Sequence, residues 1–279
     1  MGRLHRHDDG TVHEHDDEHP SDRATGTSES EHGDHSAYET GRERVQVLER
    51  IFDENDRTAA LNRSAFLDNG ICAVNLMSSP GAGKTTLLRE TLARLTPTVR
   101  VGVVEGDIET AIDANRLAGF GASISLVNTG AGFGGECHLD APMVRSALAR
   151  LPLADLELVL IENVGNLVCP AEFDVGAFAS AMVYSVTDGE DKPLKYPVMF
   201  RAVELVVINK IDLLSHLDYD LAAFRTNLAA VNPAVATIEM SARTGDGVDA
   251  WCDWLIAHMA QIRQGRPPAW DQALDGSSR

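Results

Sequence analysis

Ser78-Ser79-Pro80-Gly81-Ala82-Gly83-Lys84-Thr85-Thr86 is the stretch that decides the fold of this chain. An apolar run over residues 71–77 precedes it and predicts a buried strand, and residues 87–92 follow it with the pattern of a helix. A strand, a glycine-rich turn ending in Lys-Thr and a helix form a phosphate cradle, because backbone N–H groups and the helix N-terminus converge on the anion. The predicted nucleotide contacts here are Pro80, Gly81, Ala82, Gly83, Lys84, Thr85 and Thr86.

Two side chains of this stretch have predicted chemical roles. Lys84 supplies a positive charge for the β- and γ-phosphates, and the Thr85 hydroxyl is a candidate Mg²⁺ ligand. The usual phosphate-loop pattern begins with glycine, whereas this chain has Ser78 at that position. A fortuitous Gly-Lys-Thr at a helix start is the alternative, and the flanking strand and helix favour the nucleotide interpretation.

Further apolar strands alternate with helical stretches downstream. This pattern predicts an α/β fold with a mostly parallel sheet and helices on both faces. Ligands of such sheets bind at the carboxyl ends of the strands. The strands are expected near residues 98–104, 123–127, 156–162, 181–186, 205–209 and 236–240, and a helix is expected over 248–263.

The chain is predicted to have four segments. Residues 1–38 form a disordered tail rich in His, Asp and Glu, because they contain too few large apolar residues to form a core. Residues 39–70 form a helical segment whose apolar face includes Ile51 and Phe52 and continues, after a possible break, through Leu61 and Phe66. Residues 71–265 form the nucleotide-binding domain, and residues 266–279 form a C-terminal tail.

Composition excludes several classes of function. The formal net charge of −18, without a basic stripe, argues against nucleic-acid partners and anionic membrane surfaces. No apolar run approaches the ~20 residues that span a bilayer, and the polar N-terminus does not resemble a secretory signal. A cytoplasmic protein is therefore expected.

Guanine is the predicted base. Asn209-Lys210-Ile211-Asp212 directly follows a strand, where the Asp212 carboxylate can accept two hydrogen bonds that guanine donates and adenine does not. Lys210 can lie along the base, and Asn209 can tie the segment to the phosphate loop. Ser241, Ala242 and Arg243 follow the last strand, where their N–H groups can reach guanine O6.

Two acidic residues at strand ends are candidates for Mg²⁺ and γ-phosphate contacts. Glu162 is followed by Asn163-Val164-Gly165, and Asp107 ends the second strand in a similar way. Together with Lys84 they form the predicted catalytic group. The alternative for both is a strand-end carboxylate that caps the next helix.

Cysteine and histidine suggest a second, softer metal. Cys137-His138 and Cys169 lie in loops beyond strands, and thiolate and imidazole suit Ni²⁺ or Zn²⁺. Spacing alone also allows ordinary loop thiols. Cys72 and Cys252 are expected in the core. Seven of the ten histidines lie in the N-terminal tail. Weak metal binding is the favoured interpretation of this segment, and a solvated tract with incidental histidines is the alternative. The candidate ligands there include His5, His7, His13, His15 and His19.

These motifs together resemble the HypB family, the nickel-incorporation GTPases of [NiFe]-hydrogenase maturation. The resemblance runs from about Tyr38 to Arg263, and its most specific part is Glu162-Asn163-Val164-Gly165-Asn166-Leu167-Val168-Cys169-Pro170. Two features depart from it: no cysteine precedes Cys72, and the loop before Cys137 has apparent extra residues at 133–136.

The resemblance implies a phosphate-loop GTPase of the dimerising SIMIBI branch that hydrolyses GTP slowly, with Mg²⁺, to gate nickel delivery. Cys137, His138 and Cys169 match the family's nickel or zinc ligands near the dimer interface. The implied partners are a second copy of the chain, a HypA-like nickel protein and the hydrogenase large subunit. A urease-type nickel GTPase, or a protein that mainly stores nickel, are the alternatives.

Overall fold

The computed structural model describes residues 4–6, 12–14, 37–107, 117, 119–129 and 137–265. The chain divides into two compact units, residues 1–45 and 46–279. In the first unit, strands β1 (Leu4–Arg6) and β2 (Val12–Glu14) pair antiparallel with His5 opposite His13, within a segment for which no regular structure was expected. The remainder of the predicted tail, and the C-terminal segment 266–279, lie outside the described residues.

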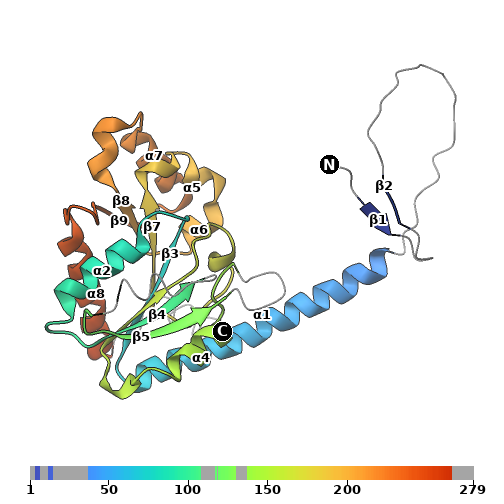
Figure 1. Ribbon diagram of the computed structural model, residues 1–279, viewed down its shortest axis with the longest axis horizontal. Helices are drawn as coiled ribbons and strands as arrows, with labels where there is room; N and C mark the ends of the chain where they lie inside the picture. Colours follow the sequence, from blue (N-terminus) through green and yellow to red (C-terminus); the bar gives the residue numbers. More distant parts are fainter. Residues whose placement is uncertain are drawn as a thin grey trace, which may run out of the picture. The chain divides into compact units, whose positions relative to one another are not determined.

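A seven-stranded sheet is the centre of the second unit, and every strand pairs in parallel with its neighbours (Figure 1). The strand order is β5-β4-β6-β3-β7-β8-β9, so β3, the strand before the phosphate loop, is the middle strand. The parallel α/β fold predicted from the sequence is thus confirmed. The strands are β3 (Cys72–Ser78), β4 (Val101–Asp107), β5 (Ser123–Asn128), β6 (Leu158–Glu162), β7 (Ala179–Ser185), β8 (Leu205–Asn209) and β9 (Ala236–Glu239).

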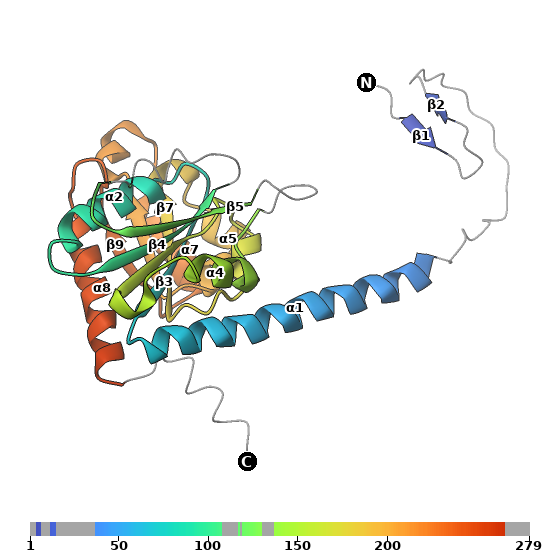
Figure 2. The same cartoon turned by 60° about the horizontal axis from the view of Figure 1, so that its bottom comes forward.

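Helices cover both faces of the sheet. Helices α2 (Lys84–Leu95) and α8 (Val248–Arg263) pack on one face, where Trp251 is fully buried. The other face is covered near β4 and β6 by α4 (Ala141–Leu148) and the C-terminal end of α1 (Ala37–Asp68), and near β7 and β8 by α6 (Pro197–Arg201) and α7 (Leu221–Val231). Figure 2 shows α1 and α4 side by side beneath the sheet. A short helix, α5 (Lys192–Lys195), precedes α6.

Helix α1 is continuous, so the expected break in the 39–70 segment is wrong. Its buried face also differs from the apolar stripe, because Asn55, Ala59, Asn62 and Phe66 are buried while Leu61 is 57% exposed. Backbone carbonyls accept from the amide of buried Asn62: Nδ2 donates to Ala141 O at 3.0 Å and to Val175 O at 3.1 Å, while Oδ1 has no hydrogen-bond partner among the described residues. These bonds join α1 to the start of α4 and to the segment before β7.

Strand β4 begins three residues later than expected. Thr98 N and Val99 N both donate to Leu95 O, so the residues after α2 close the helix instead of starting a strand. At its other end β4 runs on to Asp107, and β5 is a full member of the sheet. Within the described residues, no helix is long and apolar enough to cross a membrane.

Gly176 shows how closely α1 approaches the sheet. At its φ of 84°, an added Cβ would lie 2.4 Å from Ala59 O. Gly176→Ala is therefore expected to lower the free energy of unfolding by about 2–5 kcal/mol, from backbone strain and overpacking together. Gly70→Ala is the matched control, because φ is 65° there and nothing lies within 4 Å of the new Cβ; its cost should be about 1–2 kcal/mol. Denaturant titration of both variants measures the difference, and equal costs would contradict the close approach.

Candidate nucleotide and metal sites

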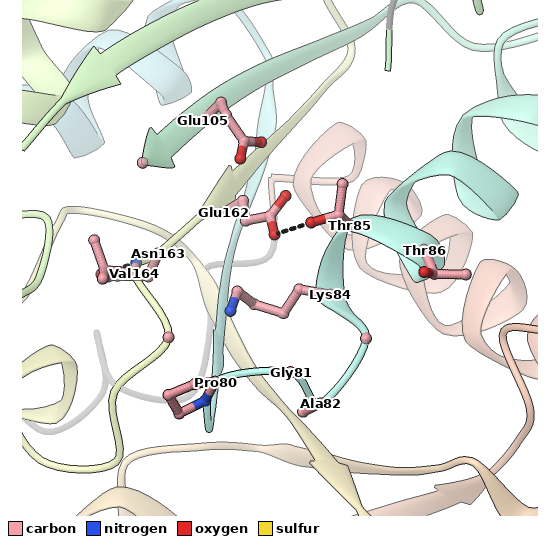
Figure 3. A pocket seen from close by; sticks show the side chains of 13 residues that line it. Pro80, Gly81, Ala82, Lys84, Thr85, Thr86, Glu105, Glu162, Asn163 and Val164 are labelled. Carbon is pink, nitrogen blue, oxygen red and sulfur yellow. Dashed lines mark hydrogen bonds between the residues drawn. The ribbon is translucent and has the colours of Figure 1, made fainter. Parts of the chain in front are cut away.

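A cavity of 450 Å³ lies at the carboxyl ends of β3, β4 and β6. Figure 3 shows Lys84 and Thr85 at the N-terminus of α2, facing the carboxylates of Glu105 and Glu162 from the strand ends. The glycine-rich turn provides the opposite wall. The lining residues are Pro80, Gly81, Ala82, Gly83, Lys84, Thr85, Thr86, Glu105, Gly106, Glu162, Asn163, Val164 and Gly165.

Ser78, the departure from the usual loop pattern, has a clear structural role. Its Oγ accepts a hydrogen bond from Lys84 Nζ at 2.6 Å and donates to Ser79 O at 2.6 Å. Ser78 thus holds the lysine amine in the cavity. Gly165 lies close to the phosphate-loop segment, since a Cβ there would lie 3.1 Å from Pro80 Cα. A glycine in place of Ser78 would lack this hydroxyl.

The acidic side of the cavity contains a residue that sequence reasoning missed. Thr85 Oγ1 donates to Glu162 Oε1 at 3.0 Å, so these two predicted residues meet. Glu105 lies directly opposite Glu162 in the β4–β6 register, and both are buried, at 2% and 3% exposure. Asp107 ends β4, and its side chain lies outside what the structure describes. The available signal was Glu105 itself, which stands in the same strand-end motif as Asp107.

Ser79 has a second partner that the motif did not suggest. Its Oγ donates to Asp188 Oδ2 at 2.5 Å, and Asp188 also accepts from Ser185 N at 3.3 Å. Asp188 lies in a short 3-10 turn directly after β7. The glycine-rich loop is therefore fixed to the turn after β7 as well as to its own strand.

A smaller cavity of 140 Å³ adjoins the first and shares Gly83 and Thr86 with it. Asn209 links the two, because Nδ2 donates to Ala82 O at 2.8 Å while Oδ1 accepts from Ala242 N at 3.0 Å. Gly83 has a φ of 102°, and a Cβ there would lie 2.5 Å from Asn209 Nδ2, so this contact requires glycine. The other lining residues are Lys210, Asp212, Leu213, Ala242 and Arg243.

The predicted base-recognition residues surround this smaller cavity. The Asp212 carboxylate is oriented by Ser241 Oγ, which donates to it at 2.6 Å, and Arg243 lies 3.8 Å away. Lys210 has a left-handed backbone with φ of 65°, and its Nζ donates to Gly81 O at 2.7 Å. A fixed carboxylate at the cavity wall suits the paired N–H donors of guanine.

Cys137, His138 and Cys169 come together in one cluster, with candidate ligand atoms all within 4.8 Å of one another. The two sulfur atoms are 2.9 Å apart, and Cys137 Sγ lies 3.9 Å from His138 Nδ1. The His138 ring stacks on Phe173 at 4.1 Å between centroids, a contact that no sequence motif indicated. Two sulfurs and one imidazole nitrogen suit nickel or zinc and leave a coordination position open.

Local structure explains the placement of these ligands. Asp140 caps α4 by accepting from Met143 N at 2.8 Å, which sets Cys137 and His138 just before the helix. Cys169 begins a 3-10 turn with the buried Pro170. The hydrogen bond with Cys137, and after it partial burial, raises the pKa of the Cys169 thiol. Metal binding must therefore displace a proton from this sulfur.

Other predicted metal ligands are not described. His5 and His13 lie in β1 and β2, and their side chains are outside the described residues. The candidates His7, His15 and His19, and the loop residues 133–136, also lie outside them. Cys72 and Cys252 are buried in the core, as expected.

Comparison with known proteins identifies relatives of this architecture. The profile of the CobW/HypB/UreG nucleotide-binding domain matches residues 72–239. Hydrogenase maturation factor HypB of Escherichia coli K12 is 46% identical over 239 residues, which cover 85% of this chain and 81% of that protein.

Two solved structures are similar as well. HypB from Helicobacter pylori in complex with nickel superposes with a TM-score of 0.70 at 32% identity, covering 77% of this chain and 98% of that one. HypB from Archaeoglobus fulgidus gives a TM-score of 0.68 at 38% identity, covering 74% and 99%. With this extent of sequence and structural similarity, the chain belongs to the HypB family of hydrogenase maturation factors.

Proposed function

We propose that this protein is a GTP-hydrolysing nickel metallochaperone that delivers nickel to the large subunit of a [NiFe]-hydrogenase. The observation that carries the proposal is the position of one segment, which lines the phosphate cavity at Glu162 to Gly165 and reaches the metal cluster at Cys169. A ligand exchange in the cavity can therefore act on a metal ligand seven residues along the chain. The nickel-bound HypB of Helicobacter pylori supports nickel as the cargo.

In this proposal the larger cavity holds the phosphates and the smaller one holds guanine. Lys84 neutralises the β- and γ-phosphates, and the N–H groups of residues 81–86 surround them. The corner formed by the Thr85 hydroxyl, Glu162 and Glu105 fits Mg²⁺, a hard cation that prefers oxygen ligands. Mg²⁺ would offset charge on the β- and γ-phosphates during hydrolysis. Asp107, at the end of β4, remains a candidate for this group.

The cluster of Cys137, His138 and Cys169 is the proposed nickel site, and Zn²⁺ suits the same ligands. A second copy of the chain, a HypA-like nickel protein and the hydrogenase large subunit are the proposed partners. The relatives' role as hydrogenase maturation factors supports this set, and a cytoplasmic location accords with it. The histidines of the N-terminal tail are proposed as weaker nickel ligands.

The function requires that nucleotide state alters nickel binding. We expect the Ni²⁺ affinity of the Cys137–His138–Cys169 site to differ by about 5- to 150-fold between GDP and a non-hydrolysable GTP analogue, the usual range of coupling between sites. The measurement is a Ni²⁺ titration read from thiolate-to-nickel charge-transfer absorption, to which the tail imidazoles do not contribute. Equal affinities, with equal oligomeric state, would contradict a nucleotide-gated carrier.

A further inference from the structure

Asn163 lies between the phosphate cavity and the metal cluster. It follows Glu162 directly, lines the cavity and is fully buried. Neither the phosphate-loop motif nor the metal-ligand pattern requires an amide at this position. Figure 3 shows it beside Val164, on the wall of the cavity that faces Lys84.

The Asn163 amide makes three hydrogen bonds. Its Oδ1 accepts from Leu139 N at 2.9 Å and from Val164 N at 2.9 Å. Its Nδ2 donates to Asn75 Oδ1 at 3.3 Å, on the strand that leads into the phosphate loop. Since buried polar groups are costly to leave unpaired, these bonds fix the orientation of the amide.

Leu139 is the residue directly after His138, so the bond to Leu139 N anchors one arm of the metal cluster, Cys137–His138. The other arm, Cys169, continues from Asn163 along the chain through Val164 and Gly165. Both arms are therefore attached to one residue that lines the larger cavity, the first through its side chain and the second through its main chain. Movement of residues 162–165 with the γ-phosphate would change the position of the two arms relative to each other.

Apart from the contact between the Cys137 and Cys169 sulfurs, which belongs to the metal cluster itself, one other hydrogen bond joins the arms among the described residues. Asn166 Nδ2 donates to Cys137 O, but at 3.4 Å and in an exposed position. A bond this long and solvated has little strength compared with the buried bond from Leu139 N. The buried path through Asn163 is thus the stronger link.

We propose that Asn163 is the positioning residue that transmits nucleotide state to the Cys137–His138 arm of the metal site. It contacts neither the metal nor the reacting phosphate through its side-chain bonds; it acts by holding Leu139 N. This inference rests on the proposed function for its nickel readout, and it has a second readout that does not require nickel.

The first test compares Ni²⁺ affinity in the full-length protein with GDP and with a non-hydrolysable GTP analogue. In Asn163→Ala the ratio of the two Ni²⁺ affinities should fall to near 1, measured at nucleotide concentrations that saturate the variant. Asn166→Ala is the comparison variant, because it removes an amide three residues away whose bond to the Cys137–His138 arm is the weak one to Cys137 O. Its other bond, from Val168 N at 2.9 Å, stays within the Cys169 arm, so the ratio should remain that of the unaltered protein. An unaltered ratio in Asn163→Ala would overturn the inference.

The second test is hydrogen exchange at the Leu139 amide in the unaltered protein, without nickel. Exchange should differ between the GDP and GTP-analogue states by about 5-fold or more. Identical exchange in both states would overturn the inference, and this readout decides the matter if Asn163→Ala fails to fold. If hydrogen exchange at Leu139 depends on nucleotide while Ni²⁺ affinity does not, the link through Asn163 is supported. That result would contradict only the proposal that nucleotide state controls nickel binding.

Discussion

Replacing Lys84 with alanine is expected to lower GTP turnover by roughly 100- to 1,000-fold, the usual effect of removing one group that stabilises transition-state charge. Lys84 is nearly buried, and its amine is held in the cavity by Ser78 Oγ at 2.6 Å. No other lysine or arginine lines this cavity, so no described neighbour there would replace its charge. The measurement is phosphate release under saturating Mg²⁺ and GTP, together with hydrogenase activity in cells that depend on this protein.

Two control variants accompany Lys84→Ala. Lys195→Ala removes a lysine that is exposed and paired with Asp191, and its turnover should equal that of the unaltered protein. Deletion of residues 1–36 distinguishes a nickel-delivery function from a nickel-storage function. Under low nickel supply, the deletion should impair hydrogenase maturation less than Lys84→Ala does. If the deletion abolishes maturation and Lys84→Ala is harmless, storage is the main function.

Loss of Cys169 is expected to reduce nickel affinity at the metal cluster by at least about 100-fold, because even groups that only orient a ligand contribute 10- to 100-fold. The Cys169 sulfur lies 2.9 Å from that of Cys137 and completes a three-ligand set with His138. In Cys169→Ala a single sulfur and an imidazole remain, which is too few ligands for tight binding. The thiolate-to-nickel absorption should weaken accordingly.

The matched control is Cys252→Ala, which removes the thiol of a residue that is 5% exposed on the buried face of α8. It should lose some stability and no nickel absorption. The raised pKa of the Cys169 thiol adds a pH dependence: the protonated form predominates near neutral pH, and nickel must displace that proton. Nickel affinity should therefore rise with pH up to the thiol pKa, and a pH-independent affinity would contradict ligation by Cys169.

The fold was largely predictable because its strands are continuous apolar runs. Strand β8 and helix α8 begin and end where the sequence predicts, since a buried strand and an amphipathic helix have distinct periods. The start of β4 was misplaced because Thr98 and Val99 suit a strand by propensity, while in the structure they close α2. Strand propensity alone did not show that the N–H groups of these two residues bond to the end of α2.

The buried side of α1 was not predictable from its apolar stripe. Asn55 and Asn62 are buried where backbone groups of residues far along the chain, at 141, 174 and 175, hydrogen-bond to their amides. A helical pattern in the sequence does not show such partners. The stripe itself is partly exposed at Ile51 and Leu61.

The residues of the candidate site also divide into those that the sequence predicted and those that it did not. Motif spacing located the glycine turn, the segment proposed to bind guanine and the clustered cysteines, because each motif is local. Glu105, Asp188 and Phe173 were missed, since each acts on a partner from another strand or loop: Glu162, Ser79 and His138. Register between neighbouring strands is what brings such residues together, and it depends on the whole sheet.

The central place of β3 has a consequence for synthesis of the protein on the ribosome. This strand is made first among the seven, yet its two neighbours, β6 and β7, end at residues 162 and 185. Until both have emerged, a strand whose seven residues are all buried in the finished sheet has no complete partner surface. The proposed guanine cavity is lined as far as residue 243, so a nascent chain contains Cys137 and Cys169 well before that cavity can form. Under the proposed function, control by GTP is thus a property only of the nearly finished polypeptide.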